Sequence, residues 1–279
     1  MNRHIRTERT GVVYTCITGG YDDLYDHSYI NHDWDYVCFT DNTNIARSGS
    51  SSWQIRQLVF NKLDNIRNNR WHKIHPHILF PEYQQSIYVD GNINILNNYL
   101  FDDVAKVLDK SHKMSVALHP DRSCIYDEFD VCVDIGKDIK ELMENQIELI
   151  RKDGFPEQQG LFESNIIYRL HHDEKVIAVM EDWWWWIEHY SRRDQLSLTY
   201  VLWKHGMSIE PLSEITYRNS NKIEFRYGKK HITEEERIKH KAKRLRKRKR
   251  RITYIIISIV AVVSLISLFI LAGSHNWLK

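Results

Sequence analysis

Three short apolar runs, each stopping abruptly at polar or glycine residues, limit most strongly how this chain can fold. The runs at residues 12–18, 35–40 and 87–90 are rich in β-branched and aromatic residues, which is typical of buried strands. Strands and helix-type patterns alternate along the chain, which predicts an α/β domain with a mostly parallel sheet. Ligands bind beyond the carboxyl ends of the strands in such sheets, so we expect the functional site where these runs stop.

Further elements are expected along the same domain. Helices are predicted at residues 61–73, 98–110, 137–152, 173–189 and 193–205. Strands are predicted at residues 115–118, 165–170 and 209–216. The sequence contains no G-x-G-x-x-G, no Walker A loop and no H-E-x-x-H, so it carries neither a dinucleotide fingerprint, a P-loop nor a zinc-protease motif.

The C-terminal part of the chain carries a long apolar run. Residues 252–272 contain no charged side chain over 21 positions, which is enough for a helix to cross a hydrocarbon core of about 30 Å. Residues 237–251 before it contain 11 Lys and Arg, and residues 273–279 after it contain one. The positive-inside rule predicts a single-pass membrane protein whose N-terminal domain is cytoplasmic. The basic segment should then lie against anionic lipids. The alternatives are a buried core helix at 252–272, and a nuclear-localisation or RNA-binding role for residues 244–251.

The net charge of +2 hides a strong asymmetry. Residues 237–279 hold 12 of the 39 Lys and Arg and no acid, which leaves 27 basic against 37 acidic residues in the rest of the chain. A domain with this excess of acids is a poor nucleic-acid binder, so no nucleic-acid partner is expected. We therefore predict four parts, a catalytic domain at 1–218, a polar and then polybasic segment at 219–251, a transmembrane helix at 252–272 and a short non-cytoplasmic tail at 273–279.

Cysteine usage agrees with a reducing compartment. The four cysteines lie in apolar or mixed contexts without a Cys-x-x-Cys pair; they are Cys16, Cys38, Cys124 and Cys132. The sequence therefore predicts neither a zinc site nor a disulfide framework. Buried, reduced thiols are typical of a cytosolic domain.

The strand ends supply candidate contacts for a nucleotide. The first strand is followed by Thr18, Gly19, Gly20 and Tyr21. Glycines there would let a nucleoside approach the backbone, with Asp41 after the second strand on its other side. The alternative is a plain tight turn. After the third strand, Asp90 and Asn92 offer a carboxylate and an amide oxygen, which Mg²⁺ or Mn²⁺ would bridge to phosphates. Asp90 could instead bond a ribose hydroxyl, or the segment could be an ordinary Asp-Gly turn.

Cationic candidates come from two places in the chain. Arg70 and Lys73 lie near the end of the predicted helix at 61–73, and Arg122 follows His119-Pro120 after a predicted strand. Cations of this kind would offset the charge of a donor diphosphate. The alternatives are a solvated helix face and a structural histidine.

Three acids are candidate catalytic groups. Asp194 opens a predicted helix, where it would act as a base toward an acceptor hydroxyl or serve only as a helix cap that the helix dipole favours. Glu163 lies in an amide-rich segment suited to reading sugar hydroxyls. Asp182 precedes four consecutive tryptophans, residues 183–186. Because four adjacent residues cannot all face the core from one helix, some tryptophans would face a groove, a sugar or a membrane interface, or cover the next helix.

Several of these stretches occur together in one known family. They are residues 13–22 (VYTCITGGYD), 36–41 (YVCFTD), 73–77 (KIHPH), 88–93 (YVDGNI) and 193–197 (RDQLS), with His119-Pro120 and Arg122. With them the chain resembles the glycosyltransferase-like family, once classed as a domain of unknown function, that includes plant proteins of pectin and mucilage synthesis and bacterial surface-polysaccharide proteins.

This resemblance implies a GT-A-like nucleotide-diphospho-sugar transferase fold. It implies that Asp90 stands where such enzymes carry an Asp-x-Asp, and it favours Asp194 as a functional acid. Asn92 stands in place of the second acid. This removes one negative charge and would weaken the binding of a metal ion.

The expected function is that of a membrane-anchored glycosyltransferase at the cytosolic face. It would move a sugar from a nucleotide-diphosphate donor to a hydroxyl of a glycan or lipid-linked glycan in surface-polysaccharide synthesis. A sugar-nucleotide hydrolase or phosphotransferase, and a non-catalytic glycan-binding or scaffold protein of the same fold, are the alternatives.

Overall fold

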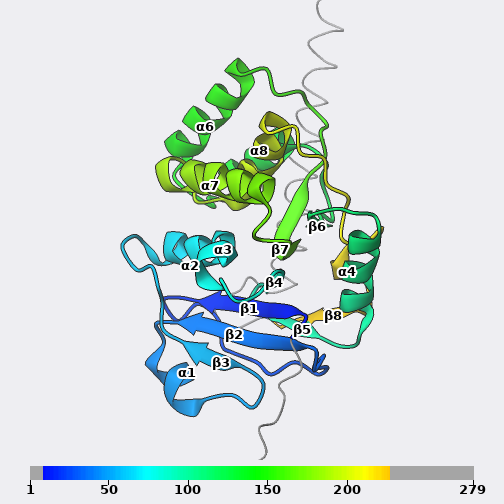
Figure 1. The fold of residues 1–279 in the computed structure, drawn as a ribbon. Coiled ribbons are helices and arrows are strands. Elements are labelled where there is room, and N and C mark those ends of the chain that lie inside the picture. Colours follow the sequence, from blue (N-terminus) through cyan, green and yellow to red (C-terminus); the bar gives the residue numbers. More distant parts are fainter. Residues whose placement is uncertain (1–8, 227–279) are drawn as a thin grey trace, which may run out of the picture. The chain divides into compact units, whose positions relative to one another are not determined.

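A computed structural model describes residues 9–226 of the protein (Figure 1). They belong to one compact unit, Met1–Gly228. Within residues 9–226, no helix is both long and apolar enough to cross a membrane. The predicted basic segment and the predicted span at 252–272 lie outside these residues.

A six-stranded mixed sheet, with strand order β3-β2-β1-β4-β7-β6, forms the centre of the unit. Its strands are β1 (Gly11–Ile17), β2 (Trp34–Thr40), β3 (Gln54–Arg56), β4 (Ser86–Val89), β6 (Met114–Leu118) and β7 (Phe162–Arg169). The pairs β1–β2, β1–β4 and β2–β3 are parallel, whereas β7 is antiparallel to both β4 and β6. The prediction of an α/β domain with a mostly parallel sheet is confirmed.

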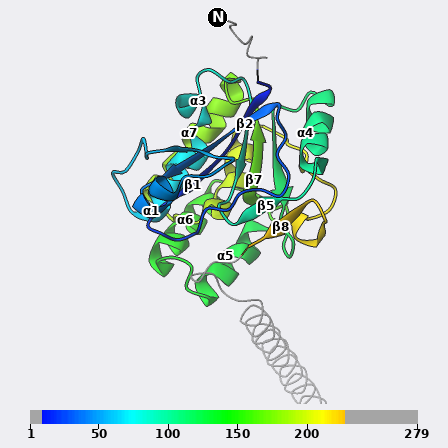
Figure 2. The ribbon, with the colours of Figure 1, turned by 90° about the horizontal axis from the view of Figure 1, so that it is seen from below.

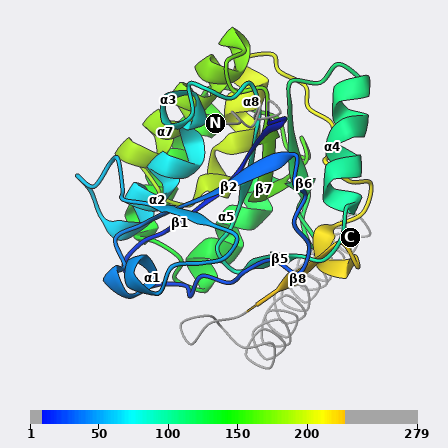
Figure 3. The same ribbon diagram turned by 60° about the horizontal axis from the view of Figure 1, so that its bottom comes forward.

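Helices cover both faces of this sheet. They are α1 (Thr43–Ser48), α2 (Asn65–Ile74), α3 (Pro76–Leu79), α4 (Tyr99–Asp109), α5 (Ile125–Asp134), α6 (Lys140–Lys152), α7 (Glu174–His189) and α8 (Leu198–Lys204), with 3₁₀ turns η1 (Asp194–Leu196) and η2 (Tyr217–Asn219). Seen from two directions, the sheet lies between α4 on one side and α2, α3 and α7 on the other (Figures 2 and 3).

Strand β1 is the clearest example of a strand buried on both faces. All seven residues are buried. Val12 and Tyr14 belong to the core cluster that contains Trp183 of α7, whereas Val13 and Ile17 belong to the cluster that contains Leu100 of α4. Double burial requires a continuous apolar run, which is why this strand could be found from the sequence.

The β7 strand starts earlier than predicted and contains a bulge. It begins at Phe162 instead of residue 165, and the pairing with β6 shifts register between Val116 and Ala117. Before the shift, the even-numbered residues face α7: Phe162 packs on the α7 cluster and Ser164 bonds to η1. Beyond the shift, the odd-numbered Ile167 belongs to the α7 cluster, whereas the even-numbered Ile166 belongs to the α4 cluster. The bulge therefore reverses which residues face each helical layer.

Two other predictions differ from the structure. Residues 209–216 form no strand, and only an isolated bridge joins Pro211 to Val116, because a proline has no N–H for a ladder. The predicted helix at 193–205 is broken into η1 and α8, so Asp194 lies in a 3₁₀ turn and not in the first turn of an α-helix.

A second, two-stranded sheet closes the described chain. Strand β5 (Ile93–Ile95) pairs antiparallel with β8 (Ile223–Phe225). The described domain therefore continues past residue 218. The four cysteines are buried and free, as expected.

Candidate active site

The loops after β1 and β2 are tied together. The backbone N–H of Gly19 donates to both carboxylate oxygens of Asp41, at 3.0 and 3.1 Å. The hydroxyl of Thr18 donates to the carbonyl of Asn65, at 2.7 Å. Gly19 and Gly20 have φ values of 60° and 58°, a conformation that favours glycine. A turn made this way exposes Tyr21, which is 51% accessible, at the carboxyl end of β1.

The loop after β4 packs against the loop after β1. A Cβ on Gly91 would lie 2.9 Å from Cγ1 of Ile17 and 3.5 Å from Cβ of Asp22, so a larger residue would have to displace the Ile17 side chain at the end of β1. The N–H of Asp90 donates to the carbonyl of Asn165 at 2.9 Å, and the Asp90 side chain is 35% exposed. The predicted contact residues Thr18, Gly19, Asp41 and Asp90 therefore lie at the same edge of the sheet.

A buried ion cluster lies beside Asp90. The Oδ2 atom of Asp194 accepts from Nζ of Lys73 at 2.7 Å and from the Ser164 hydroxyl at 2.8 Å. Nε of Arg70 is 3.0 Å from the same oxygen, and Lys73 Nζ is 3.8 Å from Oδ1 of Asp90. The Lys73 and Asp194 side chains are only 1% and 3% exposed, whereas Arg70 is 17% exposed. Helix α2, strand β7 and turn η1 thus converge on one carboxylate.

The electrostatics of this cluster are dominated by the cations around Asp194. Burial alone would raise the pKa of Asp194, but Arg70, Lys73 and Arg193 outweigh it and hold that pKa well below its usual range. Burial lowers the pKa of Lys73, and Asp194 and Asp90 oppose this shift. A carboxylate with so low a pKa stays ionised and is a weak proton acceptor.

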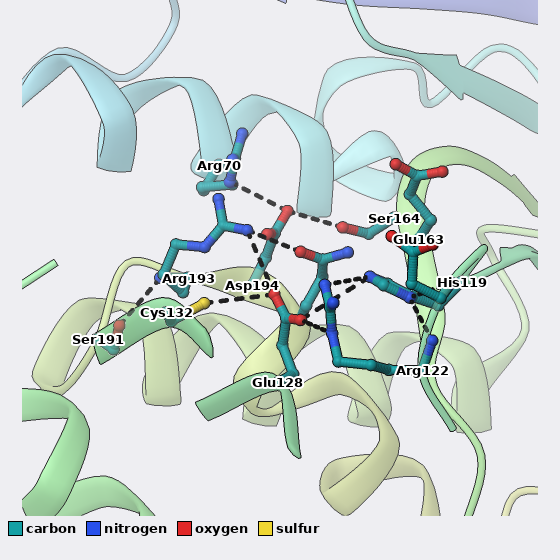
Figure 4. A network of polar contacts seen from close by, with 12 residues as sticks. Arg70, His119, Arg122, Glu128, Cys132, Glu163, Ser164, Ser191, Arg193 and Asp194 are labelled. Carbon is teal, nitrogen blue, oxygen red and sulfur yellow. Dashed lines mark hydrogen bonds and ion pairs between the residues drawn. The ribbon is translucent and has the colours of Figure 1, made fainter. Parts of the chain in front are cut away.

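A second cluster surrounds Glu128 of α5 (Figure 4). Glu128 is 3% exposed and accepts a charge-assisted hydrogen bond from Nε of Arg122 and a weaker one from the Cys132 thiol, at 3.2 Å. Nη2 of Arg193 lies 3.8 Å from its Oε1. Because Arg193 also acts on Asp194, it links the two clusters.

His119 belongs to the same group. Its Nδ1 accepts from the backbone N–H of Asp121 and of Arg122, at 3.2 and 3.1 Å. Burial, together with the charge of Arg122, lowers the pKa of His119 to about 4. The ring is therefore neutral near pH 7.

The remaining predicted residues lie in different surroundings. Glu163 accepts two bonds from Nε of Arg218, at 2.8 and 3.0 Å. Asp182 pairs instead with His205 and Lys204, at 3.0 and 3.2 Å. Glu163 is next in sequence to Ser164 of the Asp194 cluster, whereas the described partners of Asp182 are two residues at the end of α8.

The four tryptophans of α7 are mostly core. Trp183, Trp184 and Trp186 are between 0% and 7% exposed, and Trp185 is 44% exposed. Nε1 of Trp183 donates to the carbonyl of Asp194 at 3.0 Å. Through Trp183, helix α7 therefore holds the turn that carries Asp194.

Four site residues had no sequence prediction of their own, namely Ser164, Arg193, Glu128 and Arg218. Arg193 stood beside Asp194 in the stretch that carried the family resemblance, and Ser164 stood in the amide-rich segment. Glu128 and Arg218 had no local signal, because their partners come from distant segments.

A divalent metal has only a partial set of ligands here. Asp90 supplies one accessible carboxylate, and Asn92 is 9% exposed. Among the described residues, no group of three or more His, Cys, Asp or Glu is arranged to hold an ion. An ion at Asp90 would therefore take most of its ligands from phosphates and water, as Mg²⁺ commonly does.

The family model of the TOD1/MUCI70 glycosyltransferase-like domain matches residues 3–225. The chain belongs to this family. The match includes every element that contributes to the two clusters, and it confirms the resemblance found in the sequence. With membership of the TOD1/MUCI70 family, the protein is classed as a glycosyltransferase whose donor is open.

Two solved structures match the chain with low TM-scores. Mouse xyloside xylosyltransferase 1 in its apo form has a TM-score of 0.40 at 8% identity, over 74% of this chain and 85% of that one. The apo bifunctional glycosyltransferase WbbM has a TM-score of 0.39 at 12% identity, over 76% of this chain and 40% of that one. No curated protein matches the sequence. The family assignment therefore depends on the family model alone.

Proposed function

We propose that the protein has a GT-A-like fold and transfers a sugar from a nucleotide-diphosphate donor to a hydroxyl of a glycan or lipid-linked glycan. The observation that carries this proposal is the ion cluster at the carboxyl edge of the sheet. Buried Asp194 and Lys73 lie beneath Arg70 and Arg193, whose side chains are 17% and 23% exposed. Arginines held in this way are already oriented and remain partly accessible, which suits them to a diphosphate.

Each group around the cluster has a role in this proposal. The loop at Thr18–Tyr21, with Asp41, would bound the nucleoside. Asp90 would bond the ribose or, with Asn92, hold Mg²⁺ or Mn²⁺; such an ion would neutralise phosphate charge. Arg70 and Arg193 would offset the charge that grows on the leaving diphosphate.

The buried residues act through their neighbours. We assign Asp194 as the anion that orients Arg70 and Lys73, because its low pKa makes it a poor base. Lys73 is buried and would not contact a phosphate directly; its positive charge would act on the phosphates through the field of the cluster. Arg122 is held by Glu128, so its effect on phosphates would be that of a nearby charge. Glu163, which is adjacent to the cluster, remains the candidate for a sugar contact or a base, ahead of Asp182.

The cellular setting is also part of the proposal. The charge-free run at 252–272 and the basic run at 237–251 support a single membrane anchor, with the catalytic domain on the cytoplasmic side and anionic lipids against the basic run. An anchor would raise the local concentration of enzyme near a lipid-linked acceptor. Surface-polysaccharide synthesis is the process that fits this arrangement.

The test is a thermal-shift screen of the full chain against UDP-, GDP-, CMP- and dTDP-sugars, with and without Mn²⁺. A donor that binds only the native state raises the melting temperature. We expect one nucleotide class to do so, and we expect Asp90→Asn to reduce the shift. Asp109→Asn, an exposed aspartate on α4, is the matched control.

Two outcomes would replace the proposal. Release of free sugar at full rate without any acceptor would identify a hydrolase. Absence of any shift with all four nucleotide classes, together with glycan binding, would identify a non-catalytic protein of this fold.

A further inference from the structure

A cavity lies beside the ion cluster, on the side of α8. It has a volume of about 330 Å³, and its lining includes apolar Phe162, Trp203, Met207 and Ile209 and polar Gln159 and Thr199. This volume is at the small end of the roughly 300–1,000 Å³ found for ligand sites. The size suits a single ring.

The end of helix α8 builds one wall of this cavity. The N–H of Gly206 donates to the carbonyl of Trp203 at 2.9 Å, and the N–H of Met207 donates to that of Leu202 at 2.8 Å. Gly206 has a φ of 55°, so the helix ends in the left-handed cap that glycine allows. The chain then turns and brings Met207 and Ile209 to the cavity that Trp203 lines.

Trp203 is an exposed aromatic ring in a fixed position. It is 39% exposed, while its ring lies 5.4 Å from that of Phe155 and 6.0 Å from that of Tyr200. A fixed ring loses little conformational entropy when a ligand stacks on it. The negative face of an aromatic ring attracts the weakly positive C–H groups of a sugar face.

A hydroxyl in the cavity wall lacks a partner. Thr199 is 5% exposed, and its hydroxyl oxygen has no hydrogen-bond partner within the described part of the chain. A buried hydroxyl without a partner costs about 1–3 kcal/mol. This oxygen is closed to solvent in the observed rotamer. A rotation about χ1 would turn it into the cavity that Thr199 lines, where a polyhydroxylated ligand can supply the missing bond and an aliphatic one cannot.

The cavity adjoins the ion cluster through strand β7. Phe162 of the cavity and Ser164 of the cluster are two residues apart and lie on the same face before the bulge, so they are separated by roughly 7 Å. Ser164 in turn bonds Asp194 at 2.8 Å. A sugar in the cavity would thus be next to the groups assigned to the donor.

We propose that this cavity, which we call the Trp203 pocket, binds one pyranose ring of the acceptor glycan, with the ring stacked on Trp203 and a hydroxyl bonded to Thr199. This assignment rests on the proposed transferase function for its biological meaning. The binding itself needs no donor, so the two can be tested separately.

The experiment uses the full chain in lipid nanodiscs, because glycosidic detergents would compete for the pocket. Saturation-transfer NMR is recorded with methyl β-D-glucopyranoside, methyl β-D-galactopyranoside and methyl β-D-xylopyranoside as probes. We expect transfer to at least one probe. Trp203→Ala should weaken its binding by about tenfold or more, and Trp203→Phe should keep most of it. Trp185→Ala, which removes an exposed tryptophan outside the pocket, should change nothing.

Two further variants separate binding in the Trp203 pocket from binding at the donor site. Thr199→Val should weaken probe binding while leaving the melting temperature unchanged or higher, since it removes an unpaired buried hydroxyl. Asp90→Asn, which changes the proposed donor site, should leave binding of the probe unchanged.

The proposal is overturned by equal probe binding in wild type and Trp203→Ala, or by no transfer to any of the three probes. It is also overturned if brominated lipids quench wild-type fluorescence more than that of Trp203→Phe. That result would identify Trp203 as a membrane contact.

Discussion

Asp194→Asn isolates the effect of one buried negative charge, because asparagine keeps the shape and can still accept from Lys73 and Ser164. The substitution leaves Lys73, which is 1% exposed, with Asp90 at 3.8 Å as its nearest anion. Removing one partner of a buried pair costs about 3–5 kcal/mol. Lys73 can limit the loss by giving up its proton.

The free energy needed to deprotonate Lys73 sets the upper limit of this loss of stability. The ordinary lysine pKa of 10.5 lies about 3.5 above pH 7, and each pH unit corresponds to about 1.4 kcal/mol, so deprotonation costs about 5 kcal/mol. For a domain of this size each kcal/mol moves the melting temperature by about 2–4 °C. We expect Asp194→Asn to melt roughly 6–20 °C below wild type.

The assay is thermal unfolding of the full chain followed by tryptophan fluorescence at pH 7, with Asp109→Asn as control. Adding Lys73→Met to Asp194→Asn should recover most of the loss, because the deeply buried charge of Lys73 is then removed together with its partner, whereas Arg70, at 17% exposed, keeps contact with water. A single variant that melts within about 2 °C of wild type, or a double variant no better than the single, would refute the assigned role of Asp194.

Two other measurements follow from the geometry. Gly91→Ala places a methyl group 2.9 Å from Ile17 and should cost about 1–3 kcal/mol in urea unfolding. Ile17→Val should relieve part of that cost; equal stability of wild type and Gly91→Ala would contradict the contact. Burial lowers the pKa of His72 to about 4 and that of His75 to about 3. Because the unfolded chain then binds more protons below about pH 6.5, stability should fall between about pH 6.5 and 4, by up to about 1.4 kcal/mol per pH unit and histidine. Urea midpoints that stay constant from pH 7.5 to 5 would disprove this.

The strands that the sequence predicted best are those buried on both faces. Such strands need unbroken apolar runs, and β1, β2 and β4 were found within two residues of their ends. The beginning of β7 was missed because Glu163 and Ser164 resemble a loop. Their burial depends on Arg218 and Asp194, which are 55 and 30 residues away, and no local pattern contains such partners.

The location of the candidate site could be predicted from the sequence, whereas the arrangement and burial of its charged side chains could be predicted only in part. Asp41 and Asp90 follow strand ends and Arg70 and Lys73 occupy one helix, so the topology brings them together. Which cation is buried could not be foreseen, because the depth of Lys73 depends on Asp194 and Tyr88, whose ring lies 5.0 Å from the ammonium. The Trp203 pocket likewise depends on the turn at Gly206.

The pairing of β8 with β5 has a practical consequence for any shortened version of this protein. The backbone N–H of Arg226 donates to the carbonyl of Asn92 at 2.7 Å, two residues from Asp90. A fragment that ends at residue 218 would lack β8, so β5 would lose its partner and become an exposed sheet edge. The loop that carries Asp90 would also lose the hydrogen bond between Arg226 and Asn92. Fragments meant to report donor affinity should therefore run at least to Arg226, and a loss of binding in shorter ones would reflect a loosened loop and not the absence of a membrane.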